Sequence, residues 1–196
     1  MPSQLRTDSD RPVKTAILVV DMVYDFTNPD GLVFYPENLQ ILPRIAEAVE
    51  TCRRHDALVI YLQHRYRAGK YDKNLLTMRP NCIEGTGGEQ IDESLTVLPG
   101  DYVIPKRRYS AFYGTDVDLV LREHDIRRVI VVGTKTNCCI RATVTDAYNL
   151  DYDVVVISDC VATNDPTVNA VHLSDIDKYL GTVISLDRLP GLLEAE

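Results

Sequence analysis

Short apolar runs alternate with amphipathic segments along most of the chain. The runs are continuous, which is typical of strands buried on both faces of a parallel sheet. They predict strands at residues 15–20, 57–62, 102–104, 129–132, 153–157 and 182–185. Between them, apolar residues recur at helical spacing and predict helices at residues 42–52, 117–124, 137–150 and 168–180. Pro43 falls in the first turn of the first helix, where its missing N–H is tolerated.

This alternation of strand and helix predicts the fold class. Strand–helix–strand units with right-handed crossovers build an α/β fold with helices on both faces of the sheet. We therefore expect a three-layer, doubly wound, mostly parallel, Rossmann-like sheet. We also expect a polar N-terminal tail at residues 1–13 and a single domain at residues 14–196. The tail is either disordered or an arm that contacts a partner subunit, and the sequence leaves both readings open.

One long stretch, residues 63–100, does not fit the strand and helix pattern. It is polar and irregular, and it holds Arg65, Arg67, Lys70, Lys73 and Arg79. A stretch of this length without periodicity is usually a functional lid or a binding loop. A charged loop is also commonly nothing more than solvated surface, so its contact with a substrate stays open.

Net charge, apolar run length and cysteine content argue against several classes of protein. The net charge of −8 argues against nucleic-acid binding, which needs a basic surface. No apolar run approaches the ~20 residues that span a bilayer, and the first residues lack the apolar centre of a secretion signal. The cysteines are odd in number and scattered: Cys52, Cys82, Cys138, Cys139 and Cys160. Free thiols of this kind suit a reducing compartment, so we expect a cytoplasmic protein without a membrane partner.

The adjacent cysteines occupy a position of chemical interest. Turn residues from Gly133 to Asn137 separate a predicted strand from a predicted helix, so Cys138 and Cys139 fall on the first helical turn. Ligands of open α/β sheets bind at this place, just past the carboxyl end of a strand. The helix N-terminus favours a thiolate. Free cysteine is also among the most buried residue types, so a purely structural role is the alternative.

Two other polar residues, Asp21 and Lys106, stand at predicted strand ends. Because the carboxyl ends of parallel strands share one edge, both can meet Cys139 there. Considered alone, Asp21 could simply cap the loop that follows its strand. Considered alone, Lys106 could be a solvent-exposed residue of a basic turn, as is expected for Arg107 and Arg108. Taken together, they supply a carboxylate base, a cation and a thiol nucleophile.

Four segments in order resemble those of a known superfamily: residues 18–26, 84–89, 106–115 and 133–147. On them the chain resembles the isochorismatase-like cysteine hydrolases, nearest in character to the N-carbamoylsarcosine amidase branch, over about residues 14–189. The resemblance implies a catalytic triad of Asp21, Lys106 and Cys139. It also implies a cis peptide at Thr134–Lys135 and an oxyanion hole made by the backbone N–H groups of Lys135 and Cys139.

The resemblance further implies a substrate pocket and an assembly. The pocket residues would be Phe26, Tyr109, Phe112 and Thr134, although core packing explains an aromatic residue equally well. Members of the superfamily commonly form homo-oligomers, so we expect a dimer or a tetramer.

The chain departs from parts of the superfamily. Nicotinamidases bind a metal through an Asp-x-His pair and a further histidine after the second strand, whereas this chain reads Gln63-His-Arg-Tyr66 there. We therefore expect no metal and no cofactor. Isochorismatases proper lack the nucleophilic cysteine, so Cys139 argues against vinyl-ether hydrolysis. Lys135 also stands where a small apolar residue is usual, and Val23 where many relatives carry Gln.

These features predict a cysteine-dependent amidohydrolase. It would cleave a C–N bond of a small amide, ureido or carbamoyl compound through a thioester intermediate. Successive helical residues point ~100° apart, so only one of the two cysteines can face the site. The spacing of Gly133 and Thr143 around Cys139 matches that of the superfamily, so the resemblance implies Cys139 rather than Cys138. The alternatives are a nicotinamidase-type amidase, a non-catalytic small-molecule-binding protein and a thiol redox protein. Adjacent cysteines are poorly placed for a disulfide, which disfavours the redox protein.

Overall fold

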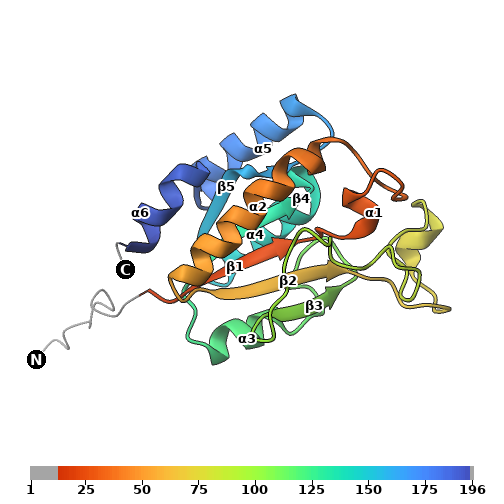
Figure 1. Ribbon diagram of the computed structural model, residues 1–196, viewed down its shortest axis with the longest axis horizontal. Helices are drawn as coiled ribbons and strands as arrows, with labels where there is room; N and C mark the ends of the chain where they lie inside the picture. Colours follow the sequence, from red (N-terminus) through yellow and green to blue (C-terminus); the bar gives the residue numbers. More distant parts are fainter. Residues whose placement is uncertain (1–12, 195–196) are drawn as a thin grey trace, which may run out of the picture.

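The computed structural model describes residues 13–194 (Figure 1). Its centre is one parallel sheet of six strands in the order β3-β2-β1-β4-β5-β6. The strands are β1 Thr15–Val20, β2 Leu58–His64, β3 Tyr102–Lys106, β4 Arg128–Thr134, β5 Asp153–Ala162 and β6 Thr182–Ile184. The chain runs outward from β1 to β3 and then returns to β4 on the other side of β1. The predicted doubly wound α/β fold is confirmed, and its switch point lies between β1 and β4.

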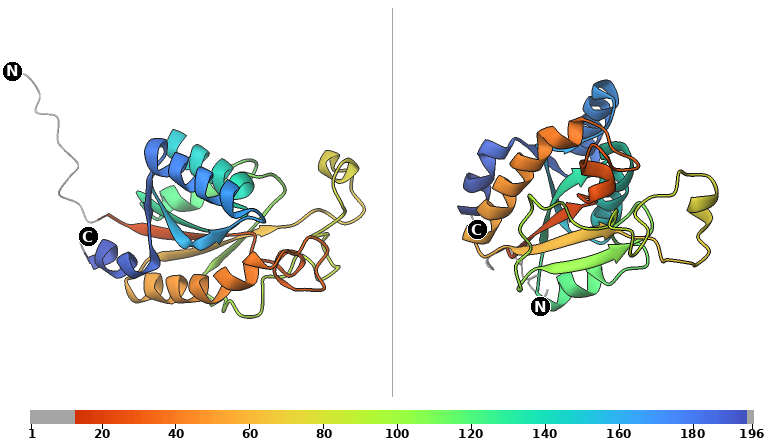
Figure 2. Two further views of the ribbon diagram at one scale, coloured as in Figure 1. Left: turned by 90° about the horizontal axis from the view of Figure 1, so that it is seen from above. Right: turned by 45° about the vertical axis from the view of Figure 1, so that its right-hand side comes forward.

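Helices cover both faces of the sheet (Figure 2). One face carries α2 Glu37–Arg54 and α6 Leu189–Glu194, and the other carries α3 Val117–Glu123, α4 Arg141–Asn149 and α5 Pro166–Tyr179. Short elements complete the chain: α1 Tyr24–Thr27, η2 Lys73–Leu76, the π-helical turn η3 Thr136–Ile140 and η4 Leu186–Arg188.

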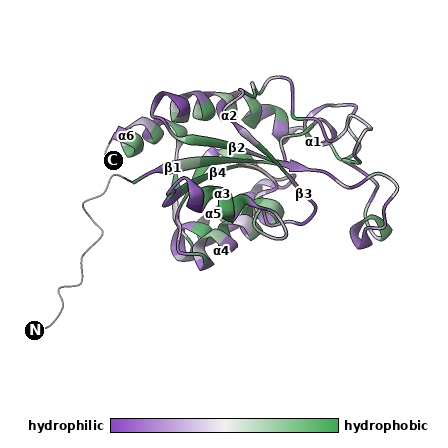
Figure 3. Ribbon diagram, turned by 90° about the horizontal axis from the view of Figure 1, so that it is seen from below, coloured by the Kyte–Doolittle hydropathy of each residue, from purple (hydrophilic) through white to green (hydrophobic). Residues whose placement is uncertain are grey.

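The buried side chains form two hydrophobic clusters, one on each face of the sheet. Along β1, Ile17 and Val19 pack in the cluster under α2, whereas Leu18 and Val20 pack in the cluster under α3 and α4. This alternation follows from the period of two in a strand. Figure 3 shows the central strands as the most hydrophobic part of the fold, which is why they read as continuous apolar runs.

The first long helix begins earlier than predicted. Helix α2 starts at Glu37, so Pro43 lies inside the helix and not in its first turn. Tertiary contacts stabilise the extra turn, because the buried Asn38 donates its side-chain amide to the Phe26 carbonyl at 2.8 Å. Ile41 adds to the same buried face. The spacing of apolar residues along the sequence does not reveal such contacts with other parts of the chain, so it placed the start of the helix too late.

The irregular stretch after β2 is anchored at two points. Val23 pairs with Ile91, and Tyr66 pairs with Ile83, as isolated bridges. Between these anchors the segment around η2 extends away from the sheet on the side of its carboxyl edge (Figure 2). The predicted tail lies outside the described residues apart from Val13, so that boundary stays a prediction. No helix within residues 13–194 is long and apolar enough to cross a membrane.

Candidate active site

Asp21, Lys106 and Cys139 meet at the carboxyl edge of the sheet. The Lys106 Nζ lies 2.8 Å from the Asp21 Oδ2. The Cys139 Sγ lies within 4.8 Å of an Asp21 carboxylate oxygen. Asp21, Lys106 and Cys139 are only 0%, 1% and 6% exposed. The structure therefore brings the three predicted catalytic side chains together in a nearly closed site.

Local backbone structure fixes Asp21 in this position. Asp21 directly follows β1 and adopts a φ of 59°, a left-handed conformation that aspartate tolerates better than most residues. Its N–H donates to the Leu62 carbonyl of β2 at 2.9 Å, and its carbonyl accepts the Val23 N–H at 2.9 Å. Neither carboxylate oxygen accepts a hydrogen bond of good geometry from the described residues. The backbone contacts and the Lys106 ion pair thus hold the carboxylate in place.

Gly133 allows β4 to approach β1 beside this aspartate. Gly133 pairs with Val20 and has a φ of +117°. A Cβ atom at this position would lie 2.0 Å from the Val20 carbonyl oxygen, so no other residue fits without a shift of the backbone. The peptide bond that follows, Thr134–Lys135, is cis.

The turn after β4 then delivers Cys139. The Lys135 carbonyl accepts the N–H groups of Cys138 and Ile140 at 3.0 and 3.1 Å, which closes the π-helical turn η3. The Thr143 hydroxyl accepts the N–H of Ala111 at 3.0 Å and ties α4 to the loop that follows Lys106. The predicted oxyanion donors, the N–H groups of Lys135 and Cys139, belong to this same turn.

The side chain of Lys135 is directed to the rim of the site. Its Nζ donates to the Asn164 Oδ1 at 2.8 Å and lies 4.9 Å from the centre of the Tyr35 ring. A lysine is compatible with the predicted oxyanion role, because that role needs only the backbone N–H.

Electrostatics in this site keep Lys106 charged. Burial opposes the ammonium, but the Asp21 carboxylate and the Cys139 sulfur outweigh burial and raise the pKa of Lys106. The Lys106 side chain therefore stays protonated across the physiological pH range.

The Cys139 thiol behaves differently from the sequence expectation. Burial, followed by the Asp21 charge, raises the pKa of Cys139 above its ordinary value, and Lys106 lowers it by less. The Lys106 ammonium lowers this pKa, as expected from a nearby cation, but burial and the Asp21 carboxylate outweigh it. A thiol in full burial beside a carboxylate keeps its proton until that carboxylate removes it.

The predicted pocket residues have different surroundings. Phe26 lies edge-on to the His64 ring, with centroids 6.0 Å apart, and Tyr109 is half exposed with a pKa raised mainly by burial. The partly buried Phe112 packs against the core cluster under α3, with its ring centroid 5.9 Å from that of Tyr152, which is the packing alternative considered above. The buried Thr134 hydroxyl is engaged with the Tyr35 hydroxyl.

The structure adds one residue that the sequence analysis did not place in the site. The His64 Nδ1 lies 3.5 Å from the Lys106 Nζ and 3.7 Å from the Asp21 Oδ2. Burial lowers the pKa of His64 to about 4, so its imidazole is neutral near pH 7. A signal was present in the sequence, because Ile60, Leu62 and His64 share one face of a strand. The predicted end of β2 at residue 62 concealed it.

Asp21, His64 and Cys139 carry the donor set that a transition metal prefers, with ligand atoms within 4.8 Å of one another. The Lys106 ammonium already contacts two of these three side chains, so a divalent cation there would meet a positive charge. The nicotinamidase pattern is not reproduced either, because Tyr66 stands two residues after His64 and its hydroxyl accepts from Asn74. These residues do not fit the metal site of the nicotinamidases.

The glycine-rich segment at residues 84–89 has a packing role. The Asp25 carboxylate accepts the N–H groups of Cys82 at 2.6 Å and Leu32 at 3.1 Å. A Cβ atom on Gly88 would lie 2.2 Å from the Asp25 Oδ2, so this loop packs directly on the buried carboxylate. The contact holds the loop beside α1 and thus beside the carboxyl edge of the sheet.

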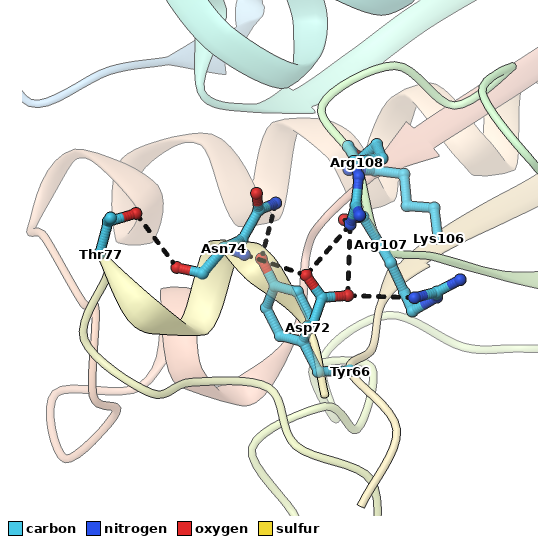
Figure 4. A network of polar contacts seen from close by, with 7 residues as sticks. All are labelled: Tyr66, Asp72, Asn74, Thr77, Lys106, Arg107 and Arg108. Atoms are coloured by element: carbon cyan, nitrogen blue, oxygen red, sulfur yellow. Dashed lines mark hydrogen bonds and ion pairs between the residues drawn. The ribbon is translucent and has the colours of Figure 1, made fainter. Parts of the chain in front are cut away.

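Basic residues line a hollow of about 670 Å³ next to this edge, among them Arg65, Arg67, Lys70, Arg107 and Arg108. Two of these side chains, Arg107 and Arg108, form ion pairs with the buried Asp72 carboxylate at 3.0 Å and 3.2 Å (Figure 4). Asp72 also accepts the N–H of Asn74 at the start of η2. The projecting segment around η2 is therefore tied to the loop that carries Lys106.

Comparison with known proteins places these motifs in a family. A family profile for the isochorismatase domain matches residues 15–188. The chain belongs to the isochorismatase family. This confirms the predicted superfamily and makes the protein an isochorismatase-family hydrolase.

Members of this family with different activities are similar to the chain. It is 32% identical over 178 residues to a probable inactive nicotinamidase of Arabidopsis thaliana, which covers 86% of this chain and 90% of the relative. It is 28% identical over 218 residues to a ureidoacrylate amidohydrolase of Agrobacterium fabrum, with 98% and 96% covered. The crystal structure of N-carbamoylsarcosine amidase from Thermoplasma acidophilum matches with a TM-score of 0.79 and 30% identity, covering 89% of this chain and 98% of that one.

Proposed function

We propose that this isochorismatase-family hydrolase is a cysteine-dependent amidohydrolase that cleaves a C–N bond of a small amide, ureido or carbamoyl compound. The observation that carries the proposal is the buried cluster of Asp21, Lys106 and Cys139, with an ion pair of 2.8 Å beside the thiol. A carboxylate base next to a thiol at a turn of backbone N–H groups is suited to acyl transfer.

The first half-reaction forms a thioester. As the Cys139 sulfur bonds to the substrate carbonyl carbon, the thiol proton passes to Asp21, consistent with the raised pKa of Cys139. The carbonyl oxygen becomes an oxyanion, which the N–H groups of Lys135 and Cys139 stabilise. When the C–N bond breaks, Asp21 returns the proton to the departing nitrogen, and ammonia or an amine leaves.

The second half-reaction restores the enzyme. Asp21, again a carboxylate, accepts a proton from water as the water oxygen attacks the thioester carbon. The second oxyanion collapses, the C–S bond breaks, and the sulfur recovers the proton from Asp21. The Lys106 ammonium stays charged throughout and holds the carboxylate in place, which agrees with its raised pKa.

The choice of substrate class rests on the departures from other branches. The nicotinamidase metal pattern is missing around His64, and a thiol nucleophile is unnecessary for vinyl-ether hydrolysis. Two similar proteins are named for a ureido substrate and an N-carbamoyl substrate. A nearly closed site around Cys139 favours small compounds. A catalytically idle binding protein is the second candidate, because one relative is named a probable inactive nicotinamidase.

Assembly and location extend the proposal. We propose a homo-oligomer, a dimer or a tetramer, in the cytoplasm, with no nucleic-acid or membrane partner and no cofactor. Five cysteines without a disulfide among the described residues and a net charge of −8 support this setting.

The test is release of ammonia or amine from a panel of small amides, ureides and N-carbamoyl compounds, measured with a coupled ammonia assay. Cys139→Ala and the neighbouring Cys138→Ala serve as matched variants. We expect release by the wild type and Cys138→Ala, and none by Cys139→Ala. Equal release by Cys139→Ala would reject the nucleophile, and no release from any compound would favour the binding protein.

A further inference from the structure

Besides the Cys139 sulfur, which helps to raise its pKa, the Lys106 ammonium has three oxygen or nitrogen acceptors within 3.5 Å. An ammonium carries three N–H groups and no acceptor, and each N–H needs a partner when it is buried. Besides the ion pair with Asp21 at 2.8 Å, the Lys106 Nζ donates to the Arg108 carbonyl at 2.9 Å and faces the His64 Nδ1 at 3.5 Å. Lys106 is only 1% exposed, so water has little room to replace any of these contacts.

We propose that His64 is a positioning residue for catalysis, with its Nδ1 acting as the third acceptor that fixes the Lys106 ammonium against Asp21. This inference rests on the proposed triad. It gives His64 no contact with the reacting atoms: the imidazole acts on Lys106, and Lys106 acts on the Asp21 carboxylate.

The proposal requires one tautomer of the imidazole. Because the ammonium only donates, the His64 Nδ1 must carry a lone pair, and the proton must lie on Nε2. The neutral state of the buried ring allows this arrangement. The charged groups that face the ring come from several elements: Asp21 after β1, Lys106 in β3, Asp72 beside η2, and Arg108 after β3.

Packing holds the ring in the orientation that this contact needs. The Phe26 and Tyr66 rings meet the imidazole nearly edge-on, at 85° and 79°, with centroids 6.0 and 4.9 Å away. The Nε2 atom is buried and has no hydrogen-bond partner among the described residues. Within residues 13–194, the polar contacts of the ring are therefore those of Nδ1 toward Lys106 and Asp21.

Strand pairing explains why His64 reaches this place. His64 pairs in register with Lys106, so the last residues of β2 and β3 stand side by side. Both point to the face that Ile60, Leu62 and Ile104 share, because they follow these residues at a spacing of two. The imidazole is thus placed by the sheet itself, which gives it the rigidity that a positioning role needs.

Nuclear magnetic resonance can determine the tautomer without any substrate. The chain has four histidines, so ¹⁵N-histidine labelling gives few signals, and His64 is assigned by its absence in His64→Asn. We expect His64 to be protonated on Nε2 alone near pH 7, and Lys106→Met to shift its Nδ1 signal while the other histidines stay unchanged. A proton on Nδ1, or no shift in Lys106→Met, would overturn the proposal.

Two substitutions test the catalytic consequence. His64→Leu keeps much of the side-chain volume but removes the acceptor, whereas His64→Asn places an amide oxygen close to the position of Nδ1. A misplaced catalytic group costs about 10²-fold in rate, so we expect kcat to fall by about that factor in His64→Leu with KM changed far less. His64→Asn should recover at least about tenfold of this loss.

Several outcomes would contradict the proposal. Wild-type kcat in His64→Leu, or an equal loss in His64→Asn and His64→Leu when both have wild-type unfolding midpoints, would show that the acceptor does not matter. The tautomer measurement on the wild type remains decisive if His64→Leu does not fold. It is also independent of the substrate, so a wrong substrate class would leave it standing while the ammonia assay fails.

Discussion

The ion pair between Asp21 and Lys106 predicts a particular pattern of stability changes. Both side chains are essentially inaccessible to water, and their charged atoms lie 2.8 Å apart. Removing one partner of such a pair leaves an uncompensated buried charge and costs about 3–5 kcal/mol. We therefore expect Asp21→Asn and Lys106→Met each to lower the free energy of unfolding by about 3–5 kcal/mol.

The double variant should be more stable than the sum of the single effects implies. Asp21→Asn with Lys106→Met removes both charges, and replacing a buried pair by neutral groups is often close to neutral in stability. What remains is the loss of a donor to the Arg108 carbonyl and to His64, at about 1–3 kcal/mol. The coupling energy should thus be on the order of 3 kcal/mol or more. None of the three variants should turn over substrate.

Urea unfolding followed by circular dichroism measures these differences, provided that the denaturant slopes of the four proteins agree. Single effects that add to within about 0.5 kcal/mol would show that the two charges do not interact in the folded protein. Turnover by the stable double variant would show that the pair is structural rather than catalytic.

The other predictions concern metal dependence, backbone packing and assembly. Hydrolysis should survive exhaustive chelation, and activity lost on chelation but restored by zinc or manganese would contradict the metal-free site. Gly133→Ala should destabilise the protein by at least about 2 kcal/mol and reduce turnover, since its Cβ would lie 2.0 Å from the Val20 carbonyl, whereas Gly100→Ala, with open space around it, should stay within about 0.5 kcal/mol of wild type. Equal effects of the two substitutions would refute the packing argument. Sedimentation at micromolar concentration should show a dimer or a tetramer, and a monomer would reject the proposed assembly.

Much of the fold was predictable because burial decides it. Runs such as residues 16–20 and 129–132 are apolar at every position, and a strand covered on both faces explains such a short run. Because these strands alternate with helices and the crossovers are right-handed, only a few sheet topologies are possible. The ends of elements were less predictable, because contacts made elsewhere in the chain set them. Asn38 extends α2 through a bond to the Phe26 carbonyl, which periodicity cannot register.

The convergence of the site followed from the same logic. Asp21, Lys106 and Cys139 were candidates because each follows a predicted strand, and parallel strands bring their carboxyl ends to one edge. His64 was considered only as a possible metal ligand and was not placed beside Lys106, because β2 was predicted to end at residue 62, whereas the strand continues to His64 and pairs there with Lys106. Because the predicted strand ended two residues too early, His64 was not recognised as a neighbour of Lys106.

Electrostatics were the least predictable part. The position of Cys139 at the start of a helix predicted a lowered pKa, whereas burial and the Asp21 carboxylate raise it. Desolvation depends on how completely a group is covered, and no local pattern reports that quantity. For the same reason Phe112 was a plausible pocket residue from its motif, but in the fold it packs against Tyr152.

The identity of the nucleophile is tested most directly by locating the modification that inactivates the enzyme. Cys138 and Cys139 lie on one tryptic peptide, residues 136–141, so tandem mass spectrometry after iodoacetamide treatment assigns the label to either sulfur. We expect loss of activity to track alkylation of Cys139, Cys139→Ser to be inactive, and Cys138→Ala to keep most of its turnover. Activity that survives in Cys139→Ser and disappears in Cys138→Ala would contradict the proposed mechanism.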